Sequence, residues 1–172
     1  MKGLFLLFFI FLSMGLYADD HANDRCKHLS HTFRCVEVAR IYDGDSIKVN
    51  IPNLHVFFAE EMSVRVTGID TAEKYGKSPC EREMAALARN FIYHRISMAK
   101  DRQSVELRSI KKDKYFRLNA QVWVNGYSIG NALIKESLAV EYDGGTKADV
   151  DWCQLKESVP GYIIELDDAP AY

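Results

Sequence analysis

The chain has 172 residues, of which 48% are hydrophobic and 27% charged, and its formal net charge at pH 7 is −2. This length predicts one domain with short appendages, and the composition is ordinary for a water-soluble globular protein. The slightly acidic balance excludes a protein that grips nucleic acid through bulk positive charge. A nucleic-acid role would therefore need a local cationic site, or a metal ion that offsets nearby acids.

The N-terminal segment has the pattern of a secretory signal peptide. Lys2 is followed by an apolar run over residues 4–12, and the small Ala18 precedes two acids. The run is too short for a comfortable bilayer span, which needs about 20 residues. We expect export, to the medium or a periplasm, with cleavage near Ala18 and no stable membrane span afterwards. An uncleaved N-terminal anchor is the alternative.

Four cysteines remain after this segment: Cys26, Cys35, Cys80 and Cys153. An even number in an exported chain predicts two disulfides, with three possible pairings. We favour a local Cys26–Cys35 bridge and a long-range Cys80–Cys153 bridge. Because His28 and His31 lie between the first two cysteines, a zinc site is an alternative, although the spacing matches no common zinc pattern.

The first half of the domain reads as strands followed by a helix. Residues 19–33 are polar and predict a linker or arm. Alternating apolar residues over 36–51, interrupted by Asp43-Gly44-Asp45, predict a β-hairpin. A third strand is expected over 62–66. Ser78 then predicts a helix start, with Pro79 in the first turn and Glu81 as a capping-box acid. Apolar residues on one face continue that helix: Cys80, Met84, Leu87 and Phe91.

The second half adds two strands and two helices. Strands are expected at 105–107 and 120–124, the second closed by Asn125-Gly126, and a helix follows from about Ser128. A short helix is expected around 149–157. This order predicts an α+β, mainly β fold, an OB-fold five-stranded barrel with two to three helices. We place the domain at 34–158 and a C-terminal tail at 159–172; the order of elements leaves barrel closure open.

Reactive side chains gather in four short pieces, each at a turn, a strand or a strand end. They are Asp43-Gly44-Asp45-Ser46, Arg65, Asp70-Thr71-Ala72-Glu73 and Asp113-Lys114-Tyr115-Phe116-Arg117. Alone, each piece is ordinary turn or surface chemistry. Together they supply oxygen ligands for a hard cation, a carboxylate to activate water and guanidinium groups to hold phosphate. This set predicts metal-assisted phosphodiester hydrolysis.

In order and spacing these pieces resemble the staphylococcal nuclease (thermonuclease-like) family, over about residues 36–152. The resemblance implies a secreted, monomeric, Ca²⁺-dependent endonuclease that hydrolyses DNA and RNA and leaves 3′-phosphate ends. It implies roles that we assign position by position: metal ligands Asp45, Asp70 and the Thr71 carbonyl, phosphate-holding Arg65 and Arg117, water-activating Glu73, and nucleotide-binding Lys114 and Tyr115.

Two departures from the family pattern affect the site. Ala72 replaces a proline before Glu73, and Phe116 replaces a glycine before Arg117, where a positive φ would strain a bulky residue. In addition, Arg65 and Asp70 are five residues apart, so Gly68 must bend the strand if both are to serve one site.

Two other classes of function stay open. A non-catalytic OB-fold module that binds nucleic acid would also use exposed aromatic residues, but here all the acids and arginines of the family pattern are present. A secreted adhesin or structural protein is the third class, with the acidic C-terminal tail as its contact surface. Nuclease activity separates the first class from both.

Overall fold

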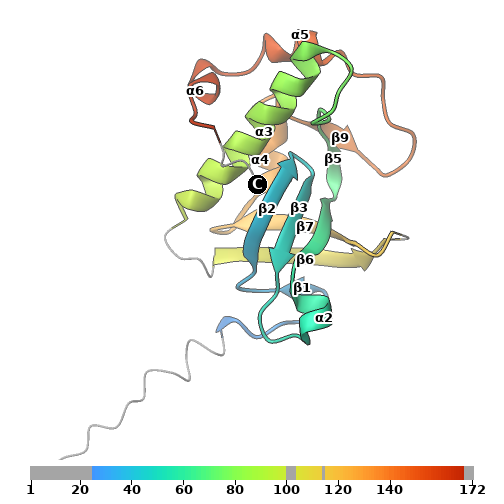
Figure 1. Ribbon diagram of the computed structural model, residues 1–172, viewed down its shortest axis with the longest axis vertical. Coiled ribbons are helices and arrows are strands. Elements are labelled where there is room, and N and C mark those ends of the chain that lie inside the picture. Colours follow the sequence, from blue (N-terminus) through green and yellow to red (C-terminus); the bar gives the residue numbers. More distant parts are fainter. Residues whose placement is uncertain (1–24, 100–103, 114, 169–172) are drawn as a thin grey trace, which may run out of the picture.

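The computed structural model describes residues 25–99, 104–113 and 115–168. The expected signal peptide and Lys114 lie outside these residues. The fold is mixed α+β and mainly strands (Figure 1). Its strands are β1 (Thr32–Phe33), β2 (Glu37–Asp43), β3 (Ser46–Asn50), β4 (Met62–Val66), β5 (Gly68–Asp70), β6 (Val105–Lys112), β7 (Leu118–Val124), β8 (Tyr127–Ser128) and β9 (Val140–Tyr142). Its helices are α2 (Val56–Ala59), α3 (Pro79–Ser97), α4 (Ile129–Lys135), α5 (Trp152–Lys156) and α6 (Gly161–Ile164).

The main sheet runs in the order β1-β6-β7-β4-β3-β2, with β8 paired to β7. All its pairs are antiparallel except β4 with β7. In Figure 1, β6 and β7 cross the direction of β2 and β3. Near the start of β2, the Val36 N–H donates to the Val105 carbonyl over 3.0 Å. The predicted OB-like fold class is confirmed, with the correction that the described strands form an open sheet and not a closed barrel.

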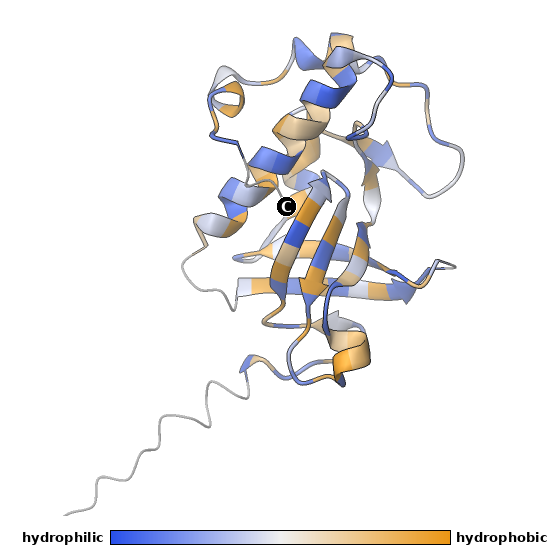
Figure 2. Ribbon diagram, in the orientation of Figure 1, coloured by the Kyte–Doolittle hydropathy of each residue, from blue (hydrophilic) through white to orange (hydrophobic). Residues whose placement is uncertain are grey.

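Helix α3 begins as predicted, because the Ser78 hydroxyl accepts a hydrogen bond from the Glu81 N–H over 3.1 Å. Its apolar residues Met84, Ala88 and Phe91 are buried in the core. Figure 2 shows hydrophobic residues alternating with hydrophilic ones along the strands beside it. The burial of one helix face against one sheet face supplies the single core that the length predicted.

Both predicted disulfides are present. Cys26 is bonded to Cys35, and Cys80, at the start of α3, is bonded to Cys153 in α5. The second bridge joins residues 73 apart in sequence. It therefore ties the C-terminal helices to the helix that covers the sheet.

The backbone bends at Gly68, the first residue of β5, whose φ is +88°. A positive φ favours glycine because it has no Cβ to collide with the backbone. After this bend, β5 leaves the main sheet and pairs with β9, so that Gly68 lies opposite Tyr142 and Asp70 opposite Val140. The bend that the Arg65–Asp70 spacing required is confirmed.

Several short elements lie outside the sequence expectations. Helix α2 lies in the connection between β3 and β4. Strand β1, which belongs to the segment expected to be an arm, pairs with β6. In the C-terminal segment, α6 buries Ile163 completely. No helix in the described part of the chain has both the length and the apolar character needed to cross a membrane.

Candidate active site

The hairpin turn between β2 and β3 carries the first acids of the site. Gly44 in this turn packs so closely that a Cβ there would lie 2.7 Å from the Thr71 Cγ2 and 2.8 Å from the Ala88 Cβ. This close approach brings the turn against both the start of the Asp70–Glu73 segment and α3. As a result, Asp45 is only 2% exposed, and its Oδ2 accepts a hydrogen bond from the Thr71 N–H over 3.2 Å.

Arg65 connects the acids of the two segments. It lies opposite Ser46 in the β3–β4 pair, which places it beside Asp45. One terminal nitrogen of its guanidinium pairs with the Asp45 Oδ1, and the other lies 3.1 Å from the Asp70 Oδ1. Both carboxylates are buried. These contacts use two of the five N–H donors of the guanidinium, so further donors remain for an anion.

Glu73 lies at the outer edge of this cluster and is exposed. Its Oε1 accepts a hydrogen bond from the Lys147 Nζ over 2.8 Å, and the same ammonium lies 2.8 Å from the Asp70 Oδ1. Burial of the ammonium opposes its charge, but its hydrogen bonds to Asp70 and Glu73 outweigh this and raise the pKa of Lys147. Lys147 is thus a cation held over the two acids, although no role was predicted for it.

The carboxyl groups of Asp43 and Asp45 are buried close to each other. Burial, followed by the charges of the Asp45 and Glu73 carboxylates, raises the pKa of Asp43 to about 7. Burial also raises the pKa of Asp45, although Arg65 opposes this. The Asp43 Oδ1 and the Thr71 Oγ1 are buried and have no hydrogen-bond partner among the described residues. Such groups are costly unless something else pairs with them.

The turn between β6 and β7 carries the second arginine. The Asp113 N–H donates to the Arg117 carbonyl over 3.0 Å, and the Asp113 carboxylate pairs with the Arg117 Nε. The Arg117 guanidinium lies 5.6 Å from the centre of the Tyr115 ring. Phe116 has a φ of +54°. The condition under which a bulky residue would be strained here, a positive φ, is therefore met.

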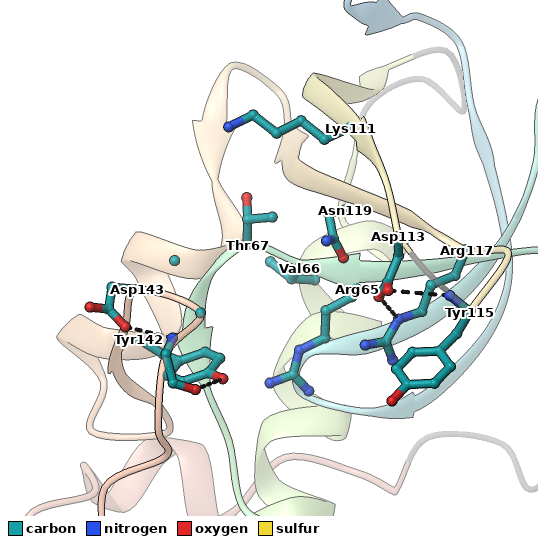
Figure 3. A pocket seen from close by; sticks show the side chains of 13 residues that line it. Arg65, Val66, Thr67, Lys111, Asp113, Tyr115, Arg117, Asn119, Tyr142 and Asp143 are labelled. Carbon is teal, nitrogen blue, oxygen red and sulfur yellow. Dashed lines mark hydrogen bonds and ion pairs between the residues drawn. The ribbon is translucent and has the colours of Figure 1, made fainter.

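Arg65 and Arg117 both line one pocket of about 600 Å³ (Figure 3). Arg65 lies between Tyr142 on one side and Tyr115 and Arg117 on the other in this view. Lys111 and Asn119 also line the pocket. They share a row across the sheet with Arg65, because Lys111 pairs with Asn119 and Asn119 with Arg65. The pocket thus gathers three cations, Arg65, Lys111 and Arg117, together with the acids Asp113 and Asp143.

The donor atoms beside the pocket fit a hard cation such as Ca²⁺. They are carboxylate oxygens from Asp45 and Asp70; the buried Oδ1 of Asp43, in the same turn as Asp45, has no hydrogen-bond partner among the described residues. No group of three or more His, Cys, Asp or Glu side chains able to hold a metal occurs among the described residues. A cation here would therefore need backbone oxygen, from the Thr71 carbonyl, and water in addition to the two carboxylates.

The structure brings together the residues that the sequence placed in four separate pieces. Asp45, Arg65 and Asp70 are in direct contact, and Glu73 is linked to Asp70 through Lys147. Arg117 and Tyr115 join Arg65 at the pocket, where Arg117 is paired with Asp113. Lys147, Lys111, Asn119 and the pairing of Asp113 with Arg117 were missed, because single polar residues in loops and strands give no signal by themselves.

Comparison with known proteins gives one family. A family model described as staphylococcal nuclease homologue matches residues 63–157, which is more than half of the chain. No curated protein matches. The matched range begins in β4 and includes Arg65, Asp70, Glu73 and Arg117. Asp45 lies before it and comes to the site through the β2–β3 hairpin.

Proposed function

The chain belongs to the staphylococcal nuclease homologue family, and from this we propose that it is an exported, Ca²⁺-dependent nuclease that hydrolyses phosphodiester bonds in DNA and RNA and leaves 3′-phosphate ends. Family membership points to a nuclease-type function. The observation that carries the more specific proposal is the position of Arg65, which contacts Asp45 and Asp70 and shares a pocket with Arg117.

The pocket supplies what phosphate binding needs. One guanidinium group reaches it from β4 and the other from the β6–β7 turn, and planar donors of this kind match the oxygens of a phosphodiester. Aromatic rings at Tyr115 and Tyr142 flank the arginines and offer faces for the adjoining nucleoside. Arg65 and Arg117 would hold the scissile phosphate and stabilise the charge that builds on its oxygens.

The reaction is a displacement by water at phosphorus. Glu73 orients the water and accepts one of its protons as the new P–O bond forms. The P–O5′ bond breaks, the phosphate stays on the 3′ carbon, and the departing 5′ oxygen gains a proton. Because Glu73 is exposed and bonded only to Lys147 among its described contacts, its carboxylate is accessible to solvent.

Asp45, Asp70 and the Thr71 carbonyl would hold the Ca²⁺. The ion would supply positive charge next to the phosphate and polarise it. Asp43, buried in the same turn as Asp45, would support the position of that ligand.

The test uses the purified mature chain with plasmid DNA, single-stranded DNA and RNA, first in Ca²⁺ and then in chelator. We expect cleavage in Ca²⁺, loss of cleavage in chelator, and 3′-phosphate ends by mass spectrometry. Asp70→Ala should lose most of the activity, whereas Asp149→Ala, an exposed loop acid, should retain it. Full cleavage in chelator would show that the acids do not hold an essential metal, and binding without cleavage would favour a non-catalytic module.

Export is supported by the N-terminal pattern and by the two disulfides. Disulfides persist in oxidising compartments and are rare in the cytosol. We propose cleavage after residues 1–18, with residues 34–158 forming the nuclease domain. Mass spectrometry of the exported chain would establish its first residue.

A further inference from the structure

An exposed aromatic cluster lies beside the pocket. Its members are Phe57 and Phe58 in α2 and Phe116 in the β6–β7 turn; 50–67% of each residue is exposed. The ring centres of Phe57 and Phe58 are 5.0 Å apart, and those of Phe57 and Phe116 are 6.2 Å apart. The two elements are distant in sequence, so the fold has assembled this cluster. We refer to these three residues as the aromatic platform.

The backbone at Phe116 makes the platform hard to explain as chance. A bulky residue with positive φ is strained, and such strain persists where the surroundings or a function maintain it. Burial does not compensate the strain, because 67% of Phe116 is exposed. Phe116 is the only aromatic residue among the described non-glycine residues with positive φ, and its ring is open to a ligand.

The platform is linked to the pocket through the β6–β7 turn, although none of its three rings lines the pocket. Phe116 lies between Tyr115 and Arg117, both of which line the pocket wall. A strand whose phosphate is held by Arg117 needs to pass only one residue of this turn to reach Phe116, and then Phe57. Helix α2 itself carries no charged residue. Two acids follow it: Glu60, which is exposed, and Glu61, whose carboxylate is paired with the Lys48 ammonium over 2.7 Å.

We propose that the aromatic platform binds unpaired bases of a single-stranded DNA or RNA substrate, next to the phosphate that is cut. This rests on the proposed nuclease function and extends it to a second subsite. Phenyl faces stack on any base, so the subsite is tolerant of sequence. It requires unstacked bases, because bases in a duplex already stack on each other. The enzyme should therefore prefer single strands longer than the pocket over duplexes and over dinucleotides.

The test compares Phe57→Ser and Phe116→Gly with a matched control, Tyr127→Ser, whose 68% exposed ring lies on β8. Steady-state cleavage is measured in Ca²⁺ on a dinucleotide, on a single-stranded 12-mer and on the same 12-mer annealed to its complement. For the single-stranded 12-mer we expect KM to rise about tenfold in both platform variants. The rise should be smaller for the dinucleotide and the duplex. Tyr127→Ser should behave as wild type.

Phe116→Gly has a second readout that guards against misfolding. Glycine accepts the positive φ, so its melting temperature should equal or exceed that of wild type while its KM for the 12-mer rises. A change in KM that is the same for all three substrates overturns the platform. A wild type that cuts none of them overturns the proposed function itself, which distinguishes the two failures.

Sedimentation with phosphatidylcholine–phosphatidylglycerol vesicles forms the last arm. One outcome would overturn the role of the platform in substrate binding. In it, wild type binds the vesicles, Phe57→Ser does not, and the KM of Phe57→Ser for the 12-mer is unchanged. The platform would then bind a lipid surface.

Discussion

The two arginines of the site are held in different ways. Arg65 has 15% of its side chain exposed and contacts acids from the β2–β3 turn and from β5. Arg117 has 35% of its side chain exposed, and its ion pair is with Asp113, four residues earlier in the same turn. The position of Arg65 is therefore set by three elements of the fold, and the position of Arg117 by one local turn.

This difference predicts how well each half of the site tolerates amino-acid substitution. The turn that carries Asp45, a partner of Arg65, is close-packed, because a Cβ at Gly44 would collide with Thr71 and Ala88. The turn around Arg117 is exposed, and it accepts Phe116 where the family pattern has glycine. Substitutions should therefore cost more on the Arg65 side, which the first of three predictions tests directly. The predictions run from the largest expected effect to the smallest.

Arg65→Lys should lower single-turnover cleavage by about 10³-fold or more, because an ammonium cannot replace a fork of donors that bridges two carboxylates and a phosphate. Arg117→Lys should lower it by about 10²-fold, because a flexible turn can bring a lysine near the same oxygens. Both substitutions conserve charge, so the measured ratio reports how rigidly each position is held.

Arg108→Lys is the matched control, since Arg108 is a strand arginine paired with Glu106 outside the pocket. It should cut as wild type does. Melting temperatures of all three variants show whether each still folds. An equal loss at Arg65 and Arg117 would mean that the two sides are equally rigid, contrary to the comparison.

Glu73→Gln should lower the rate by roughly 10²–10³-fold while nucleotide and Ca²⁺ affinity stay close to wild type, because general-base assistance is typically worth about 10²–10⁴-fold. Glu83→Gln is its control, as Glu83 is also an exposed acid paired with a lysine. Stopped-flow cleavage and equilibrium binding separate the two effects. A Glu73→Gln enzyme within about threefold of wild type, a barrier change under ~0.7 kcal/mol, would remove Glu73 from the water-activating role.

The parts of the fold that the sequence predicted are those with local causes. Ser78 capped the helix that it was expected to cap, and the Asp43-Gly44-Asp45 turn joined two alternating strands. Both depend on residues within a few positions of each other. Gly68 was a local signal as well, because the spacing of Arg65 and Asp70 required a bend.

What the sequence could not predict depends on contacts between distant segments. The pairing of β5 with β9 joins residues about seventy positions apart, and no periodicity marks either three-residue strand. Helix α2 has four residues, too few for a helical repeat. Its ring contact with Phe116 exists only after the sheet has formed. The open edge of the sheet likewise depends on strand geometry and not on strand order.

Lys147 is the clearest example, and it gives the prediction with the smallest effect. It lies 74 residues from Glu73 in an irregular segment, yet its ammonium bonds both Glu73 and Asp70. A Ca²⁺ ion at Asp70 would compete with this ammonium for the same oxygen. Lys147→Met should therefore bind Ca²⁺ more tightly, by up to about fivefold, since a partly exposed ion pair is worth at most about 1 kcal/mol. Calorimetric titration with Ca²⁺ measures this directly, with Lys156→Met as control, because Lys156 pairs with Glu83. Weaker Ca²⁺ binding by Lys147→Met would instead mean that this lysine holds Asp70 and Glu73 in the arrangement that the metal needs.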